Sequence, residues 1–370
     1  MDPREQFCSN LDCPARGKVG QQNIVVHSRK EKRFKCSVCG KTFTQRCGTV
    51  LYWLHHEEEL VVRVVTLLAH GCPVQAIVAA FGLDERTVMS WEERSGRQCQ
   101  QVHAHLVQQP RDLEHVQADE IRVKAQKKVL WVAMAMMVST RLWLGAVVSQ
   151  RRDIWLITQL IQIVRFSALA RPVLFCVDGF KAYLSAIRHV FRSPLPTGKL
   201  GRPRLVEWPN ICIGQMVKQY QGKFVVGVLR RMAHGTLDLA QALIAKTKSG
   251  CHINTAFIER LNATFRSRIA SLARRSRALL RNADTLEPLV YLMGSVYNFC
   301  TYHQSLRLTG LIGGHKWIER TPAIAAAITD HRWTVQELLL FRIPPPVWTP
   351  PVQRGRPSLA QKALIARWCS

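Results

Sequence analysis

The chain has 370 residues, of which 47% are hydrophobic, which is enough for a sizeable core and for more than one domain. Lysine and arginine number 52 against 25 aspartates and glutamates, so the formal net charge is +27 and the expected partner is a polyanion. The longest apolar run, residues 129–138, is shorter than the ~20 residues that cross a bilayer, and the first residues lack a signal-peptide pattern, so we expect an intracellular protein without a membrane role.

Residues 1–50 hold five of the twelve cysteines, in a pattern typical of a zinc ribbon. Cys8 and Cys13 form one closely spaced pair, and Cys36 and Cys39 form a second. Two such pairs suit the tetrahedral coordination of structural Zn²⁺, which would supply folding energy to a module too small for a core of its own. Cys47 is expected to lie outside the ligand set, and the alternative for all five is free thiols in a reducing compartment.

Residues 51–97 have the pattern of a helix-turn-helix domain. Apolar residues recur at helical spacing over 57–69, Pro73 opens a second helix that ends at 81, and Asp84 is predicted to cap a third over 85–94. The outward face of the third helix would enter the major groove of DNA. Its predicted reading residues are Arg86, Thr87 and Ser90. The alternative is a three-helix bundle without a role in DNA binding.

Residues 98–115 are predicted to form a linker, with His103, His105 and His115 at solvated positions. From residue 116 the pattern changes to that of an α/β domain, predicted over 116–305. Strands are expected at 116–123, 129–138 and 142–148, a helix over 153–169, a strand at 173–177, a helix over 180–191, strands at 211–217 and 223–229, and a helix over 237–246. This order predicts a mixed sheet with helices on both faces.

The predicted core contains a basic, Pro- and Gly-rich insertion at 192–210, and a helical, Pro- and Arg-rich tail follows at 306–370. A Gly-Arg-Pro motif occurs in each. Its flanking and internal arginines resemble those of an AT-hook, which lies along a narrow minor groove, and the alternative is an ordinary basic loop. The candidate contacts are Arg202, Arg204, Arg354 and Arg356. The tail is expected to pack on the core or to link protomers.

Acids are scarce in this chain, and three of them lie at the ends of predicted core elements or on a basic helix: Asp119, Asp178 and Glu259. Divalent Mg²⁺ prefers oxygen ligands, and two such ions ~3.5–4 Å apart can activate an attacking oxygen and stabilise a leaving one in phosphodiester displacement. The three acids therefore predict a site for Mg²⁺ or Mn²⁺. Glu207 and Asp238 remain alternatives to Glu259.

The neighbours of these acids were assigned by spacing. Glu120 would face the opposite side of the strand from Asp119 and is left out of the site. Arg266 lies two helical turns after Glu259, on the same helix face, so both side chains can contact one phosphate backbone. The predicted DNA contacts after Glu259 are Arg260, Asn262, Arg266 and Arg268. The alternative is a solvated basic helix in which Glu259 forms a surface ion pair.

The predicted zinc ribbon and helix-turn-helix, followed by Ala118-Asp119-Glu120, Val177-Asp178-Gly179 and Asn254-x-x-x-Ile258-Glu259-Arg260-x-Asn262-x-x-x-Arg266, resemble a bacterial insertion-sequence transposase of the DDE class. The resemblance is greatest to the insertion-sequence-one family and covers roughly residues 5–305. It implies an RNase H-like core in which Asp119, Asp178 and Glu259 are the catalytic, metal-binding triad and Arg266 is the basic residue after the glutamate. The insertion at 192–210 and the tail depart from compact members of the family.

The resemblance also implies an activity and partners. The activity is Mg²⁺-dependent cleavage at transposon ends and transfer of the free 3′-hydroxyl to target DNA. The partners are double-stranded DNA, as transposon ends and as target, and further copies of the chain in a homodimer or larger assembly on DNA. The implied location is the bacterial cytoplasm, in association with the nucleoid. Two alternatives remain: a non-enzymatic DNA-binding regulator derived from a transposase, and a structure-specific DNA nuclease of the same fold.

Overall fold

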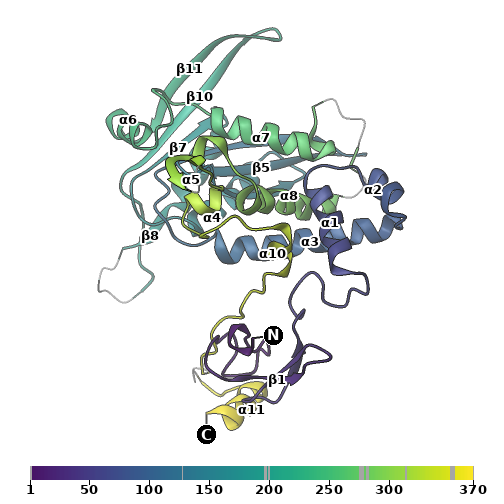
Figure 1. Ribbon diagram of the computed structural model, residues 1–370. Coiled ribbons are helices and arrows are strands. Elements are labelled where there is room, and N and C mark those ends of the chain that lie inside the picture. The colour runs from purple at the N-terminus through teal and green to yellow at the C-terminus, as the bar shows by residue number, and fades with distance from the viewer. Residues whose placement is uncertain are drawn as a thin grey trace. The chain divides into compact units, whose positions relative to one another are not determined.

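The computed structural model describes residues 2–126, 128–195, 198, 201–274, 279–280, 283–312, 315–350 and 355–369. The chain separates into two compact units, one made of residues 1–55 with 340–370 and the other of residues 56–339 (Figure 1). The predicted tail is therefore divided, because residues up to 339 belong to the larger unit. Among the described residues, no helix combines the length and apolar character needed to span a membrane.

The smaller unit is built around a three-stranded antiparallel sheet, in the order β1-β2-β3. Its elements are η1 (Pro3–Glu5), β1 (Ile24–Ser28), β2 (Arg33–Cys36), β3 (Thr42–Thr44) and α11 (Leu359–Trp368). Its core is small: Phe34 stacks on Phe43, and five buried or partly buried cysteines lie beside them. The Arg342 guanidinium packs over the Phe7 ring, at 4.4 Å from its centroid. So few apolar side chains leave the folding of this unit dependent on the cysteines.

The larger unit begins with three helices, as predicted: α1 (Glu58–Ala69), α2 (Val74–Phe81) and α3 (Glu85–Leu106). Asp84 caps α3 through a hydrogen bond from the Arg86 backbone N–H, at 2.8 Å. Val88 and Trp91 face inward and are buried. The prediction was wrong about the length of α3. The helix continues through residues 98–106, which were assigned to a linker.

The extension of α3 has a physical reason. Cys99, Val102 and His103 lie on one face of the helix and are buried where it packs against α8 (Leu286–Ser295). The prediction of solvated histidines was therefore wrong for two of them. The His103 Nε2–H donates a hydrogen bond to the Leu144 carbonyl oxygen, at 2.9 Å, and burial lowers the pKa of His103 to about 4. His115 is also fully buried, beside Ser249, and burial lowers its pKa to about 3.

A six-stranded mixed sheet forms the centre of the larger unit, in the order β11-β10-β7-β4-β5-β6. The strands are β4 (His115–Lys124), β5 (Val129–Met137), β6 (Trp143–Ser149), β7 (Val173–Asp178), β10 (Ile211–Gln221) and β11 (Phe224–His234). Strands β4, β5 and β6 form an antiparallel meander, β7 is parallel to β4, and β10 is parallel to β7. Residues 173–177 of β7 are all buried, as expected for a central parallel strand.

Helices cover both faces of this sheet, which confirms the mixed α/β architecture (Figure 1). On one face α4 (Ile154–Phe166) and α5 (Lys181–Val190) pack against each other, and α7 (Ala256–Arg268) packs over β4 on the other. The two faces are distinguished by adjacent residues of β4: Asp119 contacts α7, whereas Glu120 lies beside Tyr183 of α5. Asp153 caps α4 by accepting a hydrogen bond from the Leu156 N–H, at 3.0 Å.

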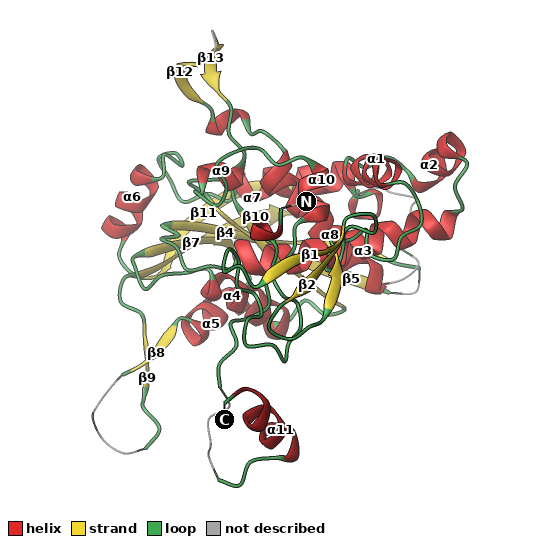
Figure 2. Ribbon diagram, turned by 60° about the horizontal axis from the view of Figure 1, so that its bottom comes forward, coloured by secondary structure: helices red, strands yellow, loops and turns green. Residues whose placement is uncertain are grey.

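The remaining elements are short. They are β8 (Arg192–Pro194), β9 (Leu205–Glu207), α6 (Leu237–Lys246), η2 (Ala270–Leu272), η3 (Ala283–Thr285), the π-helical η4 (Val296–Cys300), η5 (Gln304–Leu306), β12 (Leu308–Ile312), β13 (His315–Ile318), α9 (Pro322–Ala325) and α10 (Val335–Leu340). Figure 2 shows the β8–β9 and β12–β13 hairpins as separate two-stranded ribbons. The two ends of the predicted insertion at 192–210 thus pair with each other in one hairpin. The tail contains a second hairpin, which the sequence analysis missed.

Candidate active site and metal centre

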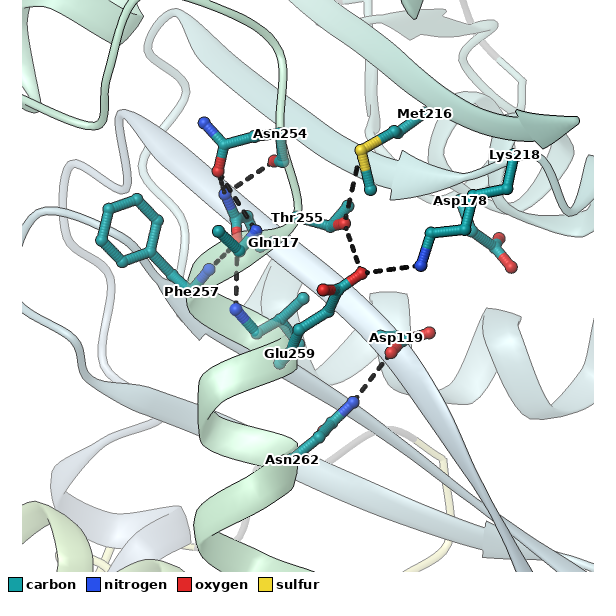
Figure 3. Close-up of polar contacts among 12 residues, drawn as sticks. Gln117, Asp119, Asp178, Met216, Lys218, Asn254, Thr255, Phe257, Glu259 and Asn262 are labelled. Atoms are coloured by element: carbon teal, nitrogen blue, oxygen red, sulfur yellow. Dashed lines mark hydrogen bonds and ion pairs between the residues drawn. The ribbon is translucent and has the colours of Figure 1, made fainter. Parts of the chain in front are cut away.

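Asp119 and Asp178 come together because their strands are parallel neighbours. Gln117 of β4 is in register with Cys176 of β7, so the residues two positions further along each strand are also side by side. Asp178 is the last residue of β7, and Glu259 lies in the first turn of α7. All three acids line one open pocket (Figure 3). The other lining residues include Arg152, Phe180, Met216, Lys218, Tyr220 and Thr255.

The two alternative acids lie elsewhere. Glu207, on β9, forms an ion pair with Arg188 at 3.2 Å, and Asp238 lies in the first turn of α6. Neither contributes to the lining of the pocket that contains Asp119 and Asp178. Of the three candidates for the third acid, Glu259 is therefore the one that lines the same pocket as the pair, although its carboxylate is not in the group of described acids that lie within 4.8 Å of one another.

Glu259 also has the ion pair that the alternative interpretation expected. Its carboxylate accepts hydrogen bonds from Lys218 at 3.1 Å and from the Thr255 hydroxyl at 3.2 Å (Figure 3). Its side chain is 47% exposed, so solvent and ligands reach it. An exposed lysine pair of this kind contributes little stability and exchanges readily for a stronger cation. The pair with Lys218 is therefore compatible with a metal-binding role for Glu259.

Glu120, which the sequence analysis left out of the site, lies close to two of its acids. Glu120 does point to the face opposite Asp119, but Asp178 ends its strand and reaches both. Carboxylate oxygens of Asp119, Glu120 and Asp178 lie within 4.8 Å of one another. Oxygens around one ion with ~2.0–2.1 Å bonds lie up to ~4.2 Å apart, so this spacing fits a site for one or two Mg²⁺ ions after small side-chain rotations.

Arg152 links two of these carboxylates. Its guanidinium is 2.8 Å from an oxygen of Glu120 and 2.8 Å from an oxygen of Asp178, and it packs over the Phe180 ring at 4.2 Å from the centroid. Burial alone would lower the pKa of Arg152, but the two carboxylates outweigh it and the pKa is raised. A metal ion at Asp178 would therefore compete with the Arg152 guanidinium for the same carboxylate.

The electrostatics of the pocket favour a cation. The pKa of Asp119 is raised to about 6, mainly by burial and also by the nearby carboxylates of Asp178 and Glu259, while the Glu120 backbone N–H and Arg266 act to lower it. Burial likewise raises the pKa of Glu120. Crowded, partly buried carboxylates of this kind resist ionisation until a positive charge is placed among them. The donor set, which consists of carboxylates, suits Mg²⁺ or Mn²⁺.

A buried glutamine holds the helix that carries Glu259. The Gln117 side-chain oxygen accepts hydrogen bonds from the backbone N–H groups of Phe257 and Ile258, both at 3.0 Å, and its nitrogen donates to the Asn254 carbonyl oxygen at 2.8 Å (Figure 3). These N–H groups belong to the first turn of α7 and have no partner within the helix. The sequence analysis missed Gln117; a polar residue at a buried strand position was the only available signal.

Asn262 also differs from its predicted role. It was expected to contact DNA, but its side chain is only 1% exposed and donates a hydrogen bond to Asp119 at 2.8 Å. Arg266 lies on the same side of α7, close enough for its charge to interact with Asp119 and Glu259, as its spacing predicted. Arg260 and Arg268 project from the other side of the helix, where they line a different groove with Arg141.

The cysteine cluster matches the prediction. Sulfur atoms of Cys8, Cys13, Cys36 and Cys39 all lie within 4.8 Å of one another, and Cys47 is not part of the group. The Cys8–Cys39 and Cys13–Cys36 sulfur separations are 3.7 and 3.9 Å. A tetrahedron with Zn–S bonds of ~2.3 Å requires sulfur separations of ~3.8 Å, so the four residues fit a zinc ion.

Burial raises the pKa of Cys13 to about 11 and that of Cys8 further. Thiolates in such a setting need a bound cation, because coordination requires the deprotonated form.

The remaining predicted DNA contacts are at the surface where they are described. Arg86 and Ser90 are exposed on α3, and Thr87 is half-buried. Arg202, Arg204 and Arg356 are exposed, whereas Arg354 lies outside the described residues, as do Lys199 and Leu200 beside the first Gly-Arg-Pro motif. No model of a known protein family matches the chain, and a search of curated proteins found no match in sequence.

Proposed function

We propose that this protein is a DNA transposase of the DDE class, which binds transposon ends and catalyses Mg²⁺-dependent strand cleavage and strand transfer. The observation that carries the proposal is that Asp119, Asp178 and Glu259, from two strands and a helix far apart in sequence, line one open pocket. A formal charge of +27 supports a nucleic acid as the substrate.

The order of the strands supports an RNase H-like core. Three antiparallel strands, β6-β5-β4, are extended by the parallel strands β7 and β10, and β11 adds an antiparallel strand at the edge. This arrangement is the one that the resemblance to insertion-sequence transposases implies. It puts the first and fourth core strands side by side, and these are the strands that carry Asp119 and Asp178.

In this proposal Asp119, Asp178 and Glu259 hold the metal ions. Bound Mg²⁺ would activate the attacking water or DNA 3′-hydroxyl and stabilise the leaving oxygen. The protein contributes position: Asn262 orients Asp119, Gln117 orients the first turn of α7, and Arg266 adds positive charge beside the pocket. The pocket is open, which leaves a phosphodiester access to the acids.

The other parts of the chain support a DNA-binding role in this scheme. In this scheme the exposed face of α3, with Arg86 and Ser90, would read a major groove, and the cysteine cluster would hold structural zinc. Two transposon ends have to be joined for strand transfer, so a homodimer or larger assembly on DNA belongs to the proposal.

The test is nicking of supercoiled plasmid DNA in the presence of Mg²⁺ or Mn²⁺. We expect Asp178→Asn to reduce the rate by at least ~10³-fold, because a charge needed for the transition state is removed. Glu207→Gln is the matched control, since it removes an acid outside the pocket, and it should nick like the wild type. Equal nicking by the wild type and Asp178→Asn would overturn the proposal.

Two other outcomes would redirect it. Sequence-specific DNA binding without nicking would favour a regulator with an inactive core. Cleavage of branched DNA without joining of strands would favour a structure-specific nuclease. A transposase should join a labelled 3′-hydroxyl end to plasmid DNA. Neither a regulator nor a structure-specific nuclease should do so.

A further inference from the structure

Helix α7 presents two functional sides. Glu259, Asn262 and Arg266 recur at three- and four-residue spacing and face the acidic pocket. Arg260, Thr264 and Arg268 recur at four-residue spacing about half a turn away, because successive residues of an α-helix differ by about 100°. The second side lines a separate groove of about 720 Å³.

The groove is lined by basic, aromatic and hydroxyl side chains. Arg141 reaches it from the turn between β5 and β6, Arg260 and Arg268 from α7, and Tyr297 and His303 from the segment after α8. Its other lining residues are Met136, Phe257, Leu261, Thr264, Thr301, Tyr302, Gln304 and Ser305. None of these is an acid, so the groove has three guanidinium groups and no carboxylate to balance them.

The positive charges are also without partners elsewhere in the described part of the chain. No ion pair joins Arg141, Arg260 or Arg268 to a described carboxylate, and the Nη1 atom of Arg268 is buried without a hydrogen-bond partner. Burial lowers the pKa of Arg141 and of Arg268. Burying a cation without an anion destabilises a fold, and proteins keep such an arrangement where a ligand supplies the missing charge.

One of the three arginines, Arg141, is held in place before any ligand arrives. The Arg141 guanidinium lies over the Phe257 ring, at 3.9 Å from its centroid, and donates a hydrogen bond to the Val138 carbonyl oxygen. The Tyr297 hydroxyl donates to the Arg141 carbonyl oxygen at 3.1 Å. Planar guanidinium groups fixed in this way are suited to bind the oxygens of a phosphate through paired N–H donors.

We propose that this groove, lined by Arg141, Arg260 and Arg268, is a second phosphate-binding site that holds a backbone phosphodiester of DNA on the side of α7 opposite the acidic pocket. The assignment of the ligand as DNA rests on the proposed function, whereas the recognition of a phosphate rests on the groove itself. Free inorganic phosphate offers the same oxygens, so an experiment has to separate the two.

The experiment compares full-length Arg268→Met with the wild type, both in the Asp178→Asn background so that no cleavage intervenes. Methionine keeps the apolar stem and removes the charge. Arg171→Met is the control with the same net charge, because Arg171 is exposed and lies 3.6 Å from Asp112. Binding of a duplex oligonucleotide is measured by fluorescence anisotropy at several salt concentrations, and melting temperature is measured with and without inorganic phosphate.

We expect Arg268→Met to bind duplex DNA roughly three- to tenfold more weakly at moderate salt and to reduce the slope of log K against log salt by about 1, as loss of one phosphate contact predicts. Without ligand its melting temperature should equal or exceed that of the wild type, because an unpaired buried charge has been removed. A purely structural arginine would give the opposite sign. Arg171→Met should change neither quantity.

Unchanged duplex affinity and salt slope in Arg268→Met would overturn the proposal. A second result would also overturn it. If inorganic phosphate stabilises the protein, and Arg268→Met abolishes this stabilisation but leaves duplex binding unchanged, then the groove is a site for a small anion and not for DNA. The outcome is separable from the proposed function. If the wild-type protein nicks DNA and Arg268→Met binds DNA as the wild type does, only the proposed phosphate site is refuted. If Arg268→Met weakens DNA binding but the wild-type protein does not nick DNA, only the proposed enzymatic activity is refuted.

Discussion

The side-chain amide of Asn262 lies 2.8 Å from a carboxylate oxygen of Asp119, and this hydrogen bond joins the helix that carries Glu259 to the central strand of the sheet. Asn262 is buried, so the bond is shielded from water. Hydrogen bonds to charged groups are stronger than those between neutral groups. The bond therefore fixes two of the three acids of the pocket relative to each other, whatever ligand the pocket binds.

Replacement of Asn262 by alanine should weaken the use of metal by the pocket. A lost hydrogen bond to a charged group costs about 1.5–3 kcal/mol, so we expect nicking at low Mg²⁺ to fall by about 10- to 100-fold. Raising the Mg²⁺ concentration should recover part of the rate, since the defect lies in orientation of Asp119. A Mg²⁺ titration of plasmid nicking measures both effects, with thermal melting as the check on folding. An unchanged Mg²⁺ dependence would show that Asn262 does not position the acid.

Replacement of Gln117 by leucine should loosen the start of α7. Leucine fills a similar volume but leaves the Phe257 and Ile258 N–H groups without an acceptor in a buried place. We expect the free energy of unfolding to fall by about 2–4 kcal/mol, as the cost of unsatisfied buried donors predicts. Gln117→Glu keeps an acceptor for these N–H groups, and at a pH low enough to protonate the new carboxyl it also keeps a donor for the Asn254 carbonyl oxygen, so it should cost less there. Urea unfolding of the two variants tests this, and equal stabilities would rule out the capping role.

Replacement of Cys36 by serine should remove zinc from the protein. The remaining three thiols cannot complete the tetrahedron, so the unit of residues 1–55 and 340–370 should lose its folded state. Cys47→Ser is the matched control, because Cys47 lies outside the cluster. Zinc content by emission spectrometry should be stoichiometric in the wild type and in Cys47→Ser and absent from Cys36→Ser. Equal loss from both variants would mean that Cys47 is a ligand.

Replacement of Glu92 by glutamine should stabilise the protein in a pH-dependent way. Burial raises the pKa of Glu92 to about 7 from 4.5. Between pH 4.5 and 7 the folded protein therefore keeps this proton while the unfolded chain releases it. The free energy of unfolding falls as the pH rises through this range, and the loss is complete above pH 7. At 1.36 kcal/mol per pKa unit, we expect Glu92→Gln to gain about 2–3 kcal/mol at pH 8 and almost nothing at pH 4.5.

The neighbouring Glu93 provides the control for this experiment. Glu93 is paired with Arg97 at 2.6 Å, on the exposed side of α3, so Glu93→Gln removes a charge without relieving a buried one. Urea unfolding at pH 4.5 and pH 8 compares the two variants with the wild type. A gain from Glu92→Gln that is the same at both pH values would contradict the assignment, because it would have to come from packing.

The order and type of most elements of the core follow from local pattern. The alternation of apolar runs and turn residues predicted β4, β5, β6, α4, β7 and α5 in the correct order. Burial of a strand, or of one face of a helix, gives the sequence a regular spacing of apolar residues, and this spacing can be read locally. The four clustered cysteines were predicted in the same way, since two short-spaced pairs leave few geometries for a ligand set.

The sequence by itself thus determined the elements, the cysteine cluster and which acids were candidates. Only the tertiary structure decided which of them meet. Glu120 joins Asp178 through Arg152, Gln117 caps a helix that begins far along the chain, and Asn262 turns inward to Asp119. The extension of α3 and the clustering beside α7 of arginines without acidic partners were likewise decided by the tertiary structure. Each of these features depends on contacts between residues that are distant in sequence. Strand register and helix packing fix such contacts, and a local pattern of apolar residues does not reveal them.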